Sequence, residues 1–540
     1  MAVLRCLRFF SVTAITTVSS LGLLWVAGPL ASASTQEKGT PLCVTALPDR
    51  FDRWLQEPAL QGATIGVALE TLDGAVLYHY QADRRFVPAS TQKLLTTAAA
   101  LEQWGGDRTW QTTVYLNPEA RELWVVGQGD PTFTEESLRD LARQVAHQLQ
   151  RRKITHLDRL VGDDRFLGEG GTPPTWEIGD TRTGYGAPAN GLVLTENAAL
   201  LTLWPQQIGE PLRLEWETPE DALDWDVENF SVSGGSDAAE FVSVSNWGRS
   251  HQGRSILRVE GVLQAGAAPE PVSVAVSEPG LRFLQHFQRA LASEGITIAA
   301  SQLLSTQTPP SEMLLFGEAG EMGETGETIA THSSPPLREL ITIANQQSQN
   351  LYAEILLRWL GKTYPHPTDL GLAPSLHENG IQQLTDMLLR WGLTPSDFTI
   401  ADGSGLSRQN SLTPTALVQV LQHSAQAPWF PIYRASLSEA GQSGTLASRF
   451  AQTPLDGKLW GKTGSMTGTM ALAGYLNPDT YSPLAFSILI NQSTASYGQL
   501  SGAIDRILAE WVNLGECSEL RIDNGELRSQ DPRFLGTSIK

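Results

Sequence analysis

Apolar and polar positions along this chain follow two patterns, one typical of helices and one typical of strands. The strand pattern is concentrated near the two ends of the chain. Near the amino end, the apolar run 64–72, the turn residues Asp73 and Gly74, and the run 75–80 predict a β-hairpin. Near the carboxyl end, three further runs predict strands at residues 460–464, 469–476 and 484–491. One sheet built from both ends of the chain, with the middle inserted, accounts for this arrangement.

The helical spacing of apolar residues predicts helices at residues 49–60, 90–101, 279–294, 336–345, 350–360, 380–391 and 497–514. Between about residues 111 and 309 the chain instead shows short strands and turns, with strands predicted at 123–126, 212–216, 241–245 and 256–262. The last three of these resemble strands of one small β module. The Gly-Glu-x rhythm within residues 312–331 predicts a solvated linker, and the residues beyond 516 predict a loose tail.

The first 33 residues predict an export signal. Arg5 and Arg8 precede a mostly apolar run over residues 9–30, and Ala31-Ser32-Ala33 matches the small-x-small pattern before a cleavage site. The apolar run also has nearly the ~20 residues that span a bilayer, so an uncleaved anchor is the alternative. Either alternative places the working protein outside the cytoplasm.

Two cysteines, Cys43 and Cys517, remain after the signal is removed. An oxidising compartment permits a disulfide that would tie the two termini together, and two free thiols are the alternative. The nine histidines include no His-Glu-x-x-His sequence, and the cysteines form no Cys-x-x-Cys pair. We therefore expect no metal site and no other cofactor.

Composition narrows the class of function. The 540-residue chain carries 38 Lys and Arg against 58 Asp and Glu, which gives a formal net charge of −20. This balance argues against a nucleic-acid partner, because phosphate binding needs a basic surface. A hydrophobic fraction of 41% with 18% charged residues is typical of a globular chain with a large core.

The first candidate chemistry lies in Ser90-Thr91-Gln92-Lys93, where a hydroxyl and an amine three residues apart share one face of the predicted helix. A serine hydroxyl becomes a good nucleophile when a base removes its proton. An amine can be that base if burial or a nearby positive charge lowers its pKa. Among only seven lysines, Lys93 alone has a serine three residues before it. An ordinary Ser and Lys at a helix start are the alternative.

A second motif, Lys462-Thr463-Gly464, lies on a predicted strand and is followed by Ser465. The glycine lets a substrate backbone lie close, while Lys and Thr offer a cation and a hydroxyl to a carboxylate. A phosphate-binding P-loop also ends in Gly-Lys-Thr, but it needs a glycine where this chain has Asp456. P-loop chemistry is therefore excluded.

A third motif is Ser348-Gln349-Asn350. Taken alone, a serine near a helix start is usually an N-cap. Its significance comes from the combination, because Ser-x-x-Lys, Ser-x-Asn and Lys-Thr-Gly in this chain order form the signature set of serine penicillin-binding proteins and β-lactamases.

On these motifs the sequence resembles the class C low-molecular-mass penicillin-binding proteins, the D-alanyl-D-alanine carboxypeptidase/endopeptidase family. The 258 residues from Ser90 to Ser348 are typical of this class and far more than in β-lactamases. Family members usually carry Asp where this chain has Gln349, a position that faces away from the chemistry. Other segments that fit the family pattern are Gly129-Asp130-Pro131-Thr132, Tyr185-Gly186-Ala187-Pro188, Glu196-Asn197, Ser334-Pro335-Pro336-Leu337, Asp402-Gly403-Ser404-Gly405-Leu406-Ser407 and Gly444-Thr445-Leu446.

The resemblance implies an α/β (α+β) fold: a β-lactamase/transpeptidase-like domain, with an antiparallel sheet flanked by helices, interrupted by two inserted, mainly β domains. It implies a catalytic domain from residues 41–112 and 327–516, a first inserted domain from 113–192 and 276–326, and a second from 193–275. Residues 1–33 are then the signal peptide and residues 517–540 the tail.

The resemblance also implies a role for each motif residue. Ser90 would attack the carbonyl between two terminal D-alanines, and Lys93 would accept its proton, kept neutral with help from the charge of Lys462. Ser348 would relay a proton to the leaving amine, and Asn350 would hold the substrate amide. Lys462 and Thr463 would bind the terminal carboxylate, and Gly464 would let the substrate backbone lie close. The N–H groups of Ser90 and Ser465 would form the oxyanion hole. Asp180 resembles a position that binds the amine of a diaminopimelate side chain, and a solvated loop Asp is the alternative.

The implied function is a serine D,D-carboxypeptidase acting on peptidoglycan stem peptides through an acyl-enzyme, with D,D-endopeptidase activity on crosslinks as an extension. The expected partners are stem peptides and covalently bound β-lactams, with membrane association at most peripheral or through an uncleaved signal. The expected location is the periplasm of a bacterial cell. A β-lactamase and a catalytically silent peptidoglycan-binding protein are the alternatives.

Overall fold

A computed structural model describes residues 42–119, 121–168, 170–304, 326–365 and 374–515, together with the backbone of 521–523 and 526–528. The predicted signal peptide and Cys517 lie outside these ranges. Cys43 is disulfide-bonded, and its pairing with Cys517 stays a prediction. Within the described ranges, no helix has both the length and the apolar character needed to cross a bilayer.

A six-stranded antiparallel sheet joins the two ends of the chain. Its strands, in spatial order, are β16 (Ser438–Glu439), β17 (Leu459–Met466), β18 (Thr469–Leu476), β19 (Leu484–Asn491), β1 (Thr64–Thr71) and β2 (Val76–Tyr80). The single sheet predicted from both ends of the sequence is therefore confirmed. The strands predicted at 469–476 and 484–491 have the bounds expected of them.

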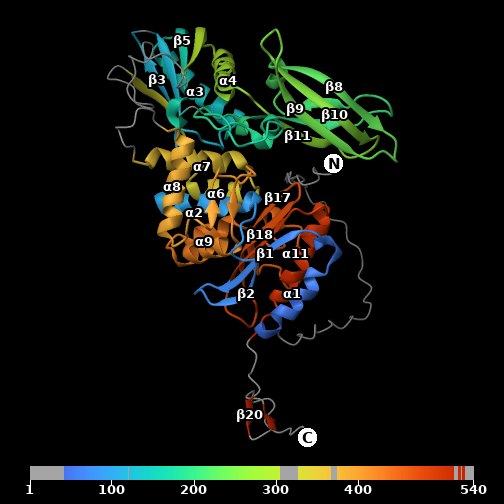
Figure 1. The fold of residues 1–540 in the computed structure, drawn as a ribbon. Coiled ribbons are helices and arrows are strands. Elements are labelled where there is room, and N and C mark those ends of the chain that lie inside the picture. The colour runs from blue at the N-terminus through green and yellow to red at the C-terminus, as the bar shows by residue number, and fades with distance from the viewer. Residues whose placement is uncertain are drawn as a thin grey trace, which may run out of the picture.

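Helices cover both faces of this sheet (Figure 1). The core on one face of the sheet is shared with α2 (Lys93–Trp104), α6 (Leu337–Gln346), α7 (Asn350–Thr363), α8 (Leu376–Arg390), α9 (Pro414–Gln426) and α10 (Phe430–Ser436), and the core on the other with α1 (Leu47–Leu55) and α11 (Tyr497–Trp511). The side chains of β18 alternate between these two cores, with Ala471 and Ala473 on the α2 side and Met470 and Leu472 on the α11 side. Small residues on the α2 side let α9 lie close to β18, β19 and β1.

Local structure around Ser90 differs from the prediction. Ser90 lies in a 3₁₀ turn, η3 (Ala89–Gln92), and the α-helix begins only at Lys93. The helix predicted at 49–60 likewise ends at Leu55, with a separate 3₁₀ turn, η2, at Pro58–Leu60. Pro58 explains the break, because a proline inside a helix removes a hydrogen bond and clashes with the preceding turn.

The inserted part contains a five-stranded mixed sheet with two helices. The strand order is β12 (Thr297–Leu304), β5 (His156–Asp163), β4 (Glu122–Gly127), β3 (Gln111–Asn117) and β13 (Glu327–Ser333), and the helices are α3 (Glu135–Arg151) and α4 (Pro279–Ser293). The linker predicted at residues 312–331 is wrong for its last part, because residues 327–331 belong to β13 and pair with β3. Alternating Thr, Ile and Ala suit a half-buried strand, and the nearby Gly-Glu rhythm concealed this pattern.

The rest of the inserted part is a sandwich of two three-stranded sheets. One has the order β8 (Trp225–Gly234), β10 (Ser255–Gln264), β9 (Phe241–Arg249), and the other β11 (Glu270–Ala275), β6 (Ala198–Trp204), β7 (Arg213–Trp216). The strands predicted at 212–216, 241–245 and 256–262 share one core, but the first lies in a different sheet from the other two. Beyond residue 516, the predicted loose tail contains a short strand pair, β20 (Arg521–Asp523) with β21 (Glu526–Arg528).

Two chain segments connect the inserted part to the helical layer, and they hold each other. The Ser334 N–H donates to the Trp110 carbonyl oxygen at 2.8 Å, and the Trp110 N–H donates to Ser334 Oγ at 3.0 Å. The Trp110 ring stacks on Trp359 of α7, with 3.4 Å between ring centroids. Both connecting segments are thus held against α7, the helix that begins at Asn350.

Candidate active site

The three sequence motifs, far apart in the chain, meet at one place. Ser90 comes from the turn before α2, Ser348 from the turn between α6 and α7, and Lys462 from β17. Lys93 and Lys462 are fully buried, whereas Ser90 and Ser348 are partly exposed. Two buried amines therefore lie beneath two accessible hydroxyls.

Lys93 is held by three oxygen atoms. Its Nζ lies 3.0 Å from Ser90 Oγ, 2.7 Å from Asn350 Oδ1 and 2.8 Å from the Ser404 carbonyl oxygen. The last two atoms can only accept hydrogen bonds, so they take both N–H groups of a neutral amine. The remaining lone pair then faces Ser90, whose O–H can donate to it.

The charge state of Lys93 follows from its surroundings. Burial lowers the pKa of Lys93 to about 7, although the carboxylates of Asp402 and Glu354 act to raise it. Near neutral pH a large part of the population therefore carries a neutral amine. Burial is the cause of this shift, and the help from the charge of Lys462 that the family resemblance implied stays a prediction.

Asn350 orients Lys93. Its Oδ1 accepts from Lys93, while its Nδ2 donates to the Tyr185 carbonyl oxygen at 2.9 Å. Because Tyr185 O can only accept, this second bond determines which end of the amide faces the amine. The Tyr185 carbonyl, in the inserted part of the chain, thus takes part in the site.

Ser348 and Lys462 form the second hydroxyl–amine pair. Lys462 Nζ donates to Ser348 Oγ at 2.9 Å and to the Thr463 carbonyl oxygen at 2.9 Å. Ser348 has a φ of +61°, in the left-handed region that few non-glycine residues adopt. Burial, and next the charge of Lys93, lower the pKa of Lys462 well below its usual value.

The strand β17 runs directly beside the Ser90 turn. A Cβ on Gly464 would lie 2.8 Å from the Pro88 carbonyl oxygen and 3.0 Å from the Ser90 nitrogen, so only glycine permits this approach. Thr463 Oγ1 donates to Thr445 Oγ1 at 2.9 Å, and the following Ser465 is exposed. The backbone nitrogen of Ser90 and the exposed end of β17 therefore border the same space.

Asp180 is connected to this constellation through one residue. It lies in the 3₁₀ turn η5 (Asp180–Arg182), and Tyr185 Oη donates to Asp180 Oδ1 at 2.8 Å. Burial raises the pKa of Asp180, while the hydrogen bond from Tyr185 acts to lower it. Since the Tyr185 carbonyl holds Asn350, Asp180 is at the rim of the site rather than among the two hydroxyl–amine pairs.

Two buried carboxylates complete the site, and the sequence analysis assigned neither of them a role. Glu354 Oε1 accepts from the backbone N–H groups of Gly403 and Ser404, each at 3.0 Å, which aims the Ser404 carbonyl at Lys93. Asp402 accepts from the N–H groups of Gly405 and Ser407 at 2.7 and 2.6 Å and so closes the same loop. The segment 402–407 was noted only as a family match, and its spacing does not reveal these bonds.

A further acid, the partly buried Glu196, contacts the residue after Ser348. Gln349 Nε2 donates to Glu196 Oε2 at 2.9 Å, and burial raises the pKa of Glu196 to about 7. Thr195, Glu196 and Asn197 have φ values of +49°, +54° and +54°, a left-handed turn that carries Glu196 inward. The inserted part thus supports the turn that presents Ser348.

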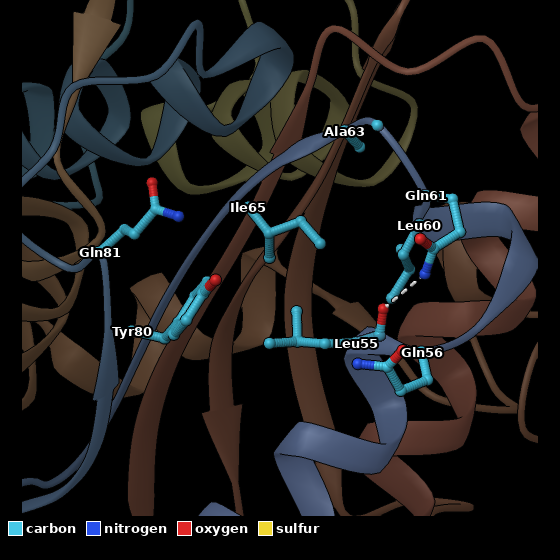
Figure 2. A pocket seen from close by; sticks show the side chains of 9 residues that line it. Leu55, Gln56, Leu60, Gln61, Ala63, Ile65, Tyr80 and Gln81 are labelled. Atoms are coloured by element: carbon cyan, nitrogen blue, oxygen red, sulfur yellow. Dashed lines mark hydrogen bonds between the residues drawn. The ribbon is translucent and has the colours of Figure 1, made fainter.

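A pocket of about 260 Å³ lies elsewhere, between the end of α1 and strands β1 and β2 (Figure 2). Leu55, Leu60, Ile65 and Tyr80 line it, and Gln61 Nε2 donates to the Leu55 carbonyl oxygen at its wall. It offers no nucleophile–base pair, and β18, β19 and β1 separate β2 from β17 in the sheet. The two hydroxyl–amine pairs, and not this pocket, therefore identify the candidate active site.

Comparisons with known proteins agree with this geometry. The sequence profile of the D-Ala-D-Ala carboxypeptidase 3 (S13) family matches residues 47–511. The chain belongs to this family. It is 30% identical over 466 residues to a D-alanyl-D-alanine carboxypeptidase of Actinomadura sp. (strain R39), covering 83% of this chain and 81% of that relative. The family predicted from the three motifs is confirmed.

Solved structures support the fold. Penicillin-binding protein 4 (dacB) from Haemophilus influenzae superimposes with a TM-score of 0.71 at 22% identity, covering 86% of this chain and 99% of that one. The same protein in complex with a β-lactam gives a TM-score of 0.66 at 23% identity, over 86% and 98% of the two chains. The predicted transpeptidase-like fold with inserted β domains is confirmed.

Proposed function

We propose that this protein is a penicillin-binding serine D,D-carboxypeptidase that hydrolyses the terminal D-Ala-D-Ala bond of peptidoglycan stem peptides through an acyl-enzyme. The observation that carries the proposal is the arrangement around Lys93. Two pure acceptors take its N–H groups, which leaves its lone pair for the proton of Ser90. Membership of a D-Ala-D-Ala carboxypeptidase family supports the choice of substrate.

In acylation, the proton of Ser90 passes to Lys93 as Oγ attacks the carbonyl carbon of the scissile bond. The N–H groups of Ser90 and Ser465 stabilise the oxyanion, an interaction of about 3–4 kcal/mol per donor in other enzymes. Ser348 gives its proton to the leaving D-alanine amine and takes one back from the Lys462 ammonium, which donates to it in the free enzyme. The proton that Lys93 gained from Ser90 then passes to Lys462, which restores the Lys462 ammonium and leaves Lys93 neutral. In deacylation, Lys93 takes a proton from water as the water attacks the ester carbonyl, and returns it to Ser90.

In substrate binding, Lys462 and Thr463 hold the terminal carboxylate, and Gly464 lets the substrate backbone lie along β17. Asn350 contributes its amide to the substrate while it orients Lys93. The carboxylate of Asp180, at the rim, binds the amine of the diamino acid in the stem. The burial of Lys462 supports this assignment, because a carboxylate would compensate an otherwise costly buried charge.

For the domain division, we propose the boundaries implied by the family resemblance with one change at each crossing between the two domains. Residues 111–112 and 327–333 move from the catalytic domain to the first inserted domain, because β3 begins at Gln111 and β13 pairs with it in the five-stranded sheet. We further propose export to the periplasm of a bacterial cell, which the signal-like residues 1–33 and the disulfide of Cys43 support.

Labelling with a fluorescent penicillin tests the proposal. We expect a stable covalent label on the wild-type protein and none on Ser90→Ala at unchanged thermal stability. Ser293→Ala, at the exposed end of α4, is the matched control and should label normally. Rapid loss of the label would indicate a β-lactamase, and a wild-type protein without label would indicate a silent peptidoglycan-binding protein. Mass spectrometry of digested sacculi then separates released D-alanine from cleaved crosslinks.

A further inference from the structure

The outer face of the β8–β10–β9 sheet carries large side chains that nothing in the described part of the chain covers. Phe230 is 61% exposed, Phe241 62%, Trp247 45% and Val232 41%. The opposite face of the same sheet packs into the core of the β sandwich. Monomeric proteins rarely expose so many large apolar groups together unless they bind something there.

Cations are interleaved with these rings. The guanidinium of Arg258 lies 3.8 Å from the centre of the Trp247 ring and 5.4 Å from that of Phe230, and Glu228 holds it at 2.8 Å. The guanidinium of Arg182 lies 4.8 Å from the Trp247 ring and makes no ion pair with any residue that the structure describes. Phe230, Arg258, Trp247 and Arg182 thus form one line across the sheet, called here the aromatic stripe.

The aromatic stripe leads to the active site. Arg182 closes the turn η5 that begins with Asp180, and the next turn, η6 (Gly184–Gly186), contains Tyr185. Thr183, between them, forms a β-bridge with Val274 of β11, so this loop rests on the β sandwich. The Tyr185 carbonyl in turn holds Asn350. One short loop therefore joins the last cation of the stripe to the catalytic lysine.

We propose that the aromatic stripe binds the glycan strand of peptidoglycan while a stem peptide of that strand occupies the active site, an inference that rests on the proposed function. The C–H faces of pyranose rings pack against exposed aromatic rings through dispersion contacts. The carboxylates of neighbouring stems attract Arg182, whose charge lacks a partner within the described ranges. Ser243 and Ser245, on β9, alternate in register with Trp247 and add hydroxyl groups for sugar oxygens.

The charges on this face favour an anionic polymer as the occupant. Arg258 is already paired with Glu228, whereas Arg182 makes no ion pair with any described residue. A polymer that carries carboxylates at regular intervals complements Arg182, on a protein whose overall charge of −20 would otherwise repel it.

The test compares a polymeric with a short substrate. We would prepare Phe230→Ala with Trp247→Ala, and separately Arg182→Gln, with Ile208→Ala as the control for loss of an exposed apolar side chain in the same sandwich. Cosedimentation with purified sacculi at 4 °C measures binding, and hydrolysis of a short synthetic peptide ending in D-Ala-D-Ala measures the active site. We expect sacculus binding to fall about tenfold in the double variant and severalfold in Arg182→Gln, with kcat/KM on the short peptide within about twofold of wild type.

Three results would overturn the proposal. The first is unchanged sacculus binding in both variants. The second is a parallel loss on the short peptide, which would mean that the stripe acts only on the active site or the fold. The third is a wild-type dimer that the double variant dissociates, which would assign the face to self-association. A wild-type protein that fails to bind penicillin would instead refute the proposed function, whatever the sacculus result.

Discussion

The most direct prediction concerns pH, because Lys93 can act as a base only when neutral. With a pKa of about 7, the neutral fraction of Lys93 is about 1% at pH 5, about 10% at pH 6 and about 90% at pH 8. Lowering the pH reduces this fraction by protonating the amine. The acylation rate should therefore fall about tenfold per pH unit below pH 7 and stop rising above pH 8, where loss of the proton on Lys462 can only lower it.

An unshifted lysine predicts a different profile. With the ordinary value of 10.5, the neutral fraction would still increase about 30-fold between pH 8 and pH 9.5. The measurement is the second-order rate constant for acylation by a fluorescent penicillin, followed by stopped flow from pH 5 to pH 10. Thermal unfolding at each pH verifies that the protein stays folded.

A matched variant isolates the role of Lys93. Lys93→Arg keeps a positive charge but cannot lose a proton in this range, so we expect acylation to fall by about 10²–10⁴ at pH 8 and to lose the wild-type dependence on pH between pH 5 and pH 8. A wild-type rate that keeps rising through pH 9.5, or a Lys93→Arg protein with the wild-type profile, would refute the assignment of Lys93 as the base.

Three further predictions follow from other parts of the structure. Gly464→Ala places a Cβ 3.0 Å from the Ser90 nitrogen and should lower kcat/KM by at least about tenfold. The control Gly498→Ala, whose added Cβ would have nothing within 4 Å, should leave kcat/KM unchanged. Equal effects of the two substitutions would contradict the close approach of β17 to the Ser90 turn. Burial alone would lower the pKa of His286, but its hydrogen bonds to Asp224 and Glu135 raise it. The stabilisation from these hydrogen bonds is therefore complete below pH 6.5 and is lost as the pH rises through the raised pKa. His286→Gln should lower the free energy of unfolding, measured by chemical denaturation, by about 1–2 kcal/mol at pH 6, and this loss should shrink by pH 8. A loss that grows with pH would show that His286 is neutral in the fold. Asp180→Asn should lower kcat/KM about tenfold for a stem peptide with a free side-chain amine and little for the same peptide acetylated there, and equal losses would assign Asp180 to the loop alone.

Much of the fold could be predicted from local patterns. The strands at residues 469–476 and 484–491 are long apolar runs because both of their faces are buried, and a run of that kind remains visible without its neighbours. The strand at 327–333 was missed because it is half-exposed and follows a Gly-Glu rhythm. Its existence depends on pairing with β3, more than 200 residues earlier in the chain.

The candidate site divides in the same way. Ser90, Lys93, Ser348, Asn350 and Lys462 were identified because each lies in a short motif with its own spacing. The contacts of Glu354 and Asp402 with the loop that holds Lys93 could not be identified from spacing. Hydrogen bonds to backbone groups leave no residue-type signal at the accepting position.

The sequence by itself determined which groups can react, how the ends of the chain share one sheet and to which family the protein belongs, because side-chain chemistry and periodicity are local properties. Only the tertiary structure decided that Lys93 is buried between two acceptors, that Lys462 donates to Ser348, and that an exposed line of arginines and aromatic rings begins beside Asp180. The physical reason is that burial lowers the pKa of an amine by removing water, and water is removed only by residues that the fold brings together from distant parts of the chain.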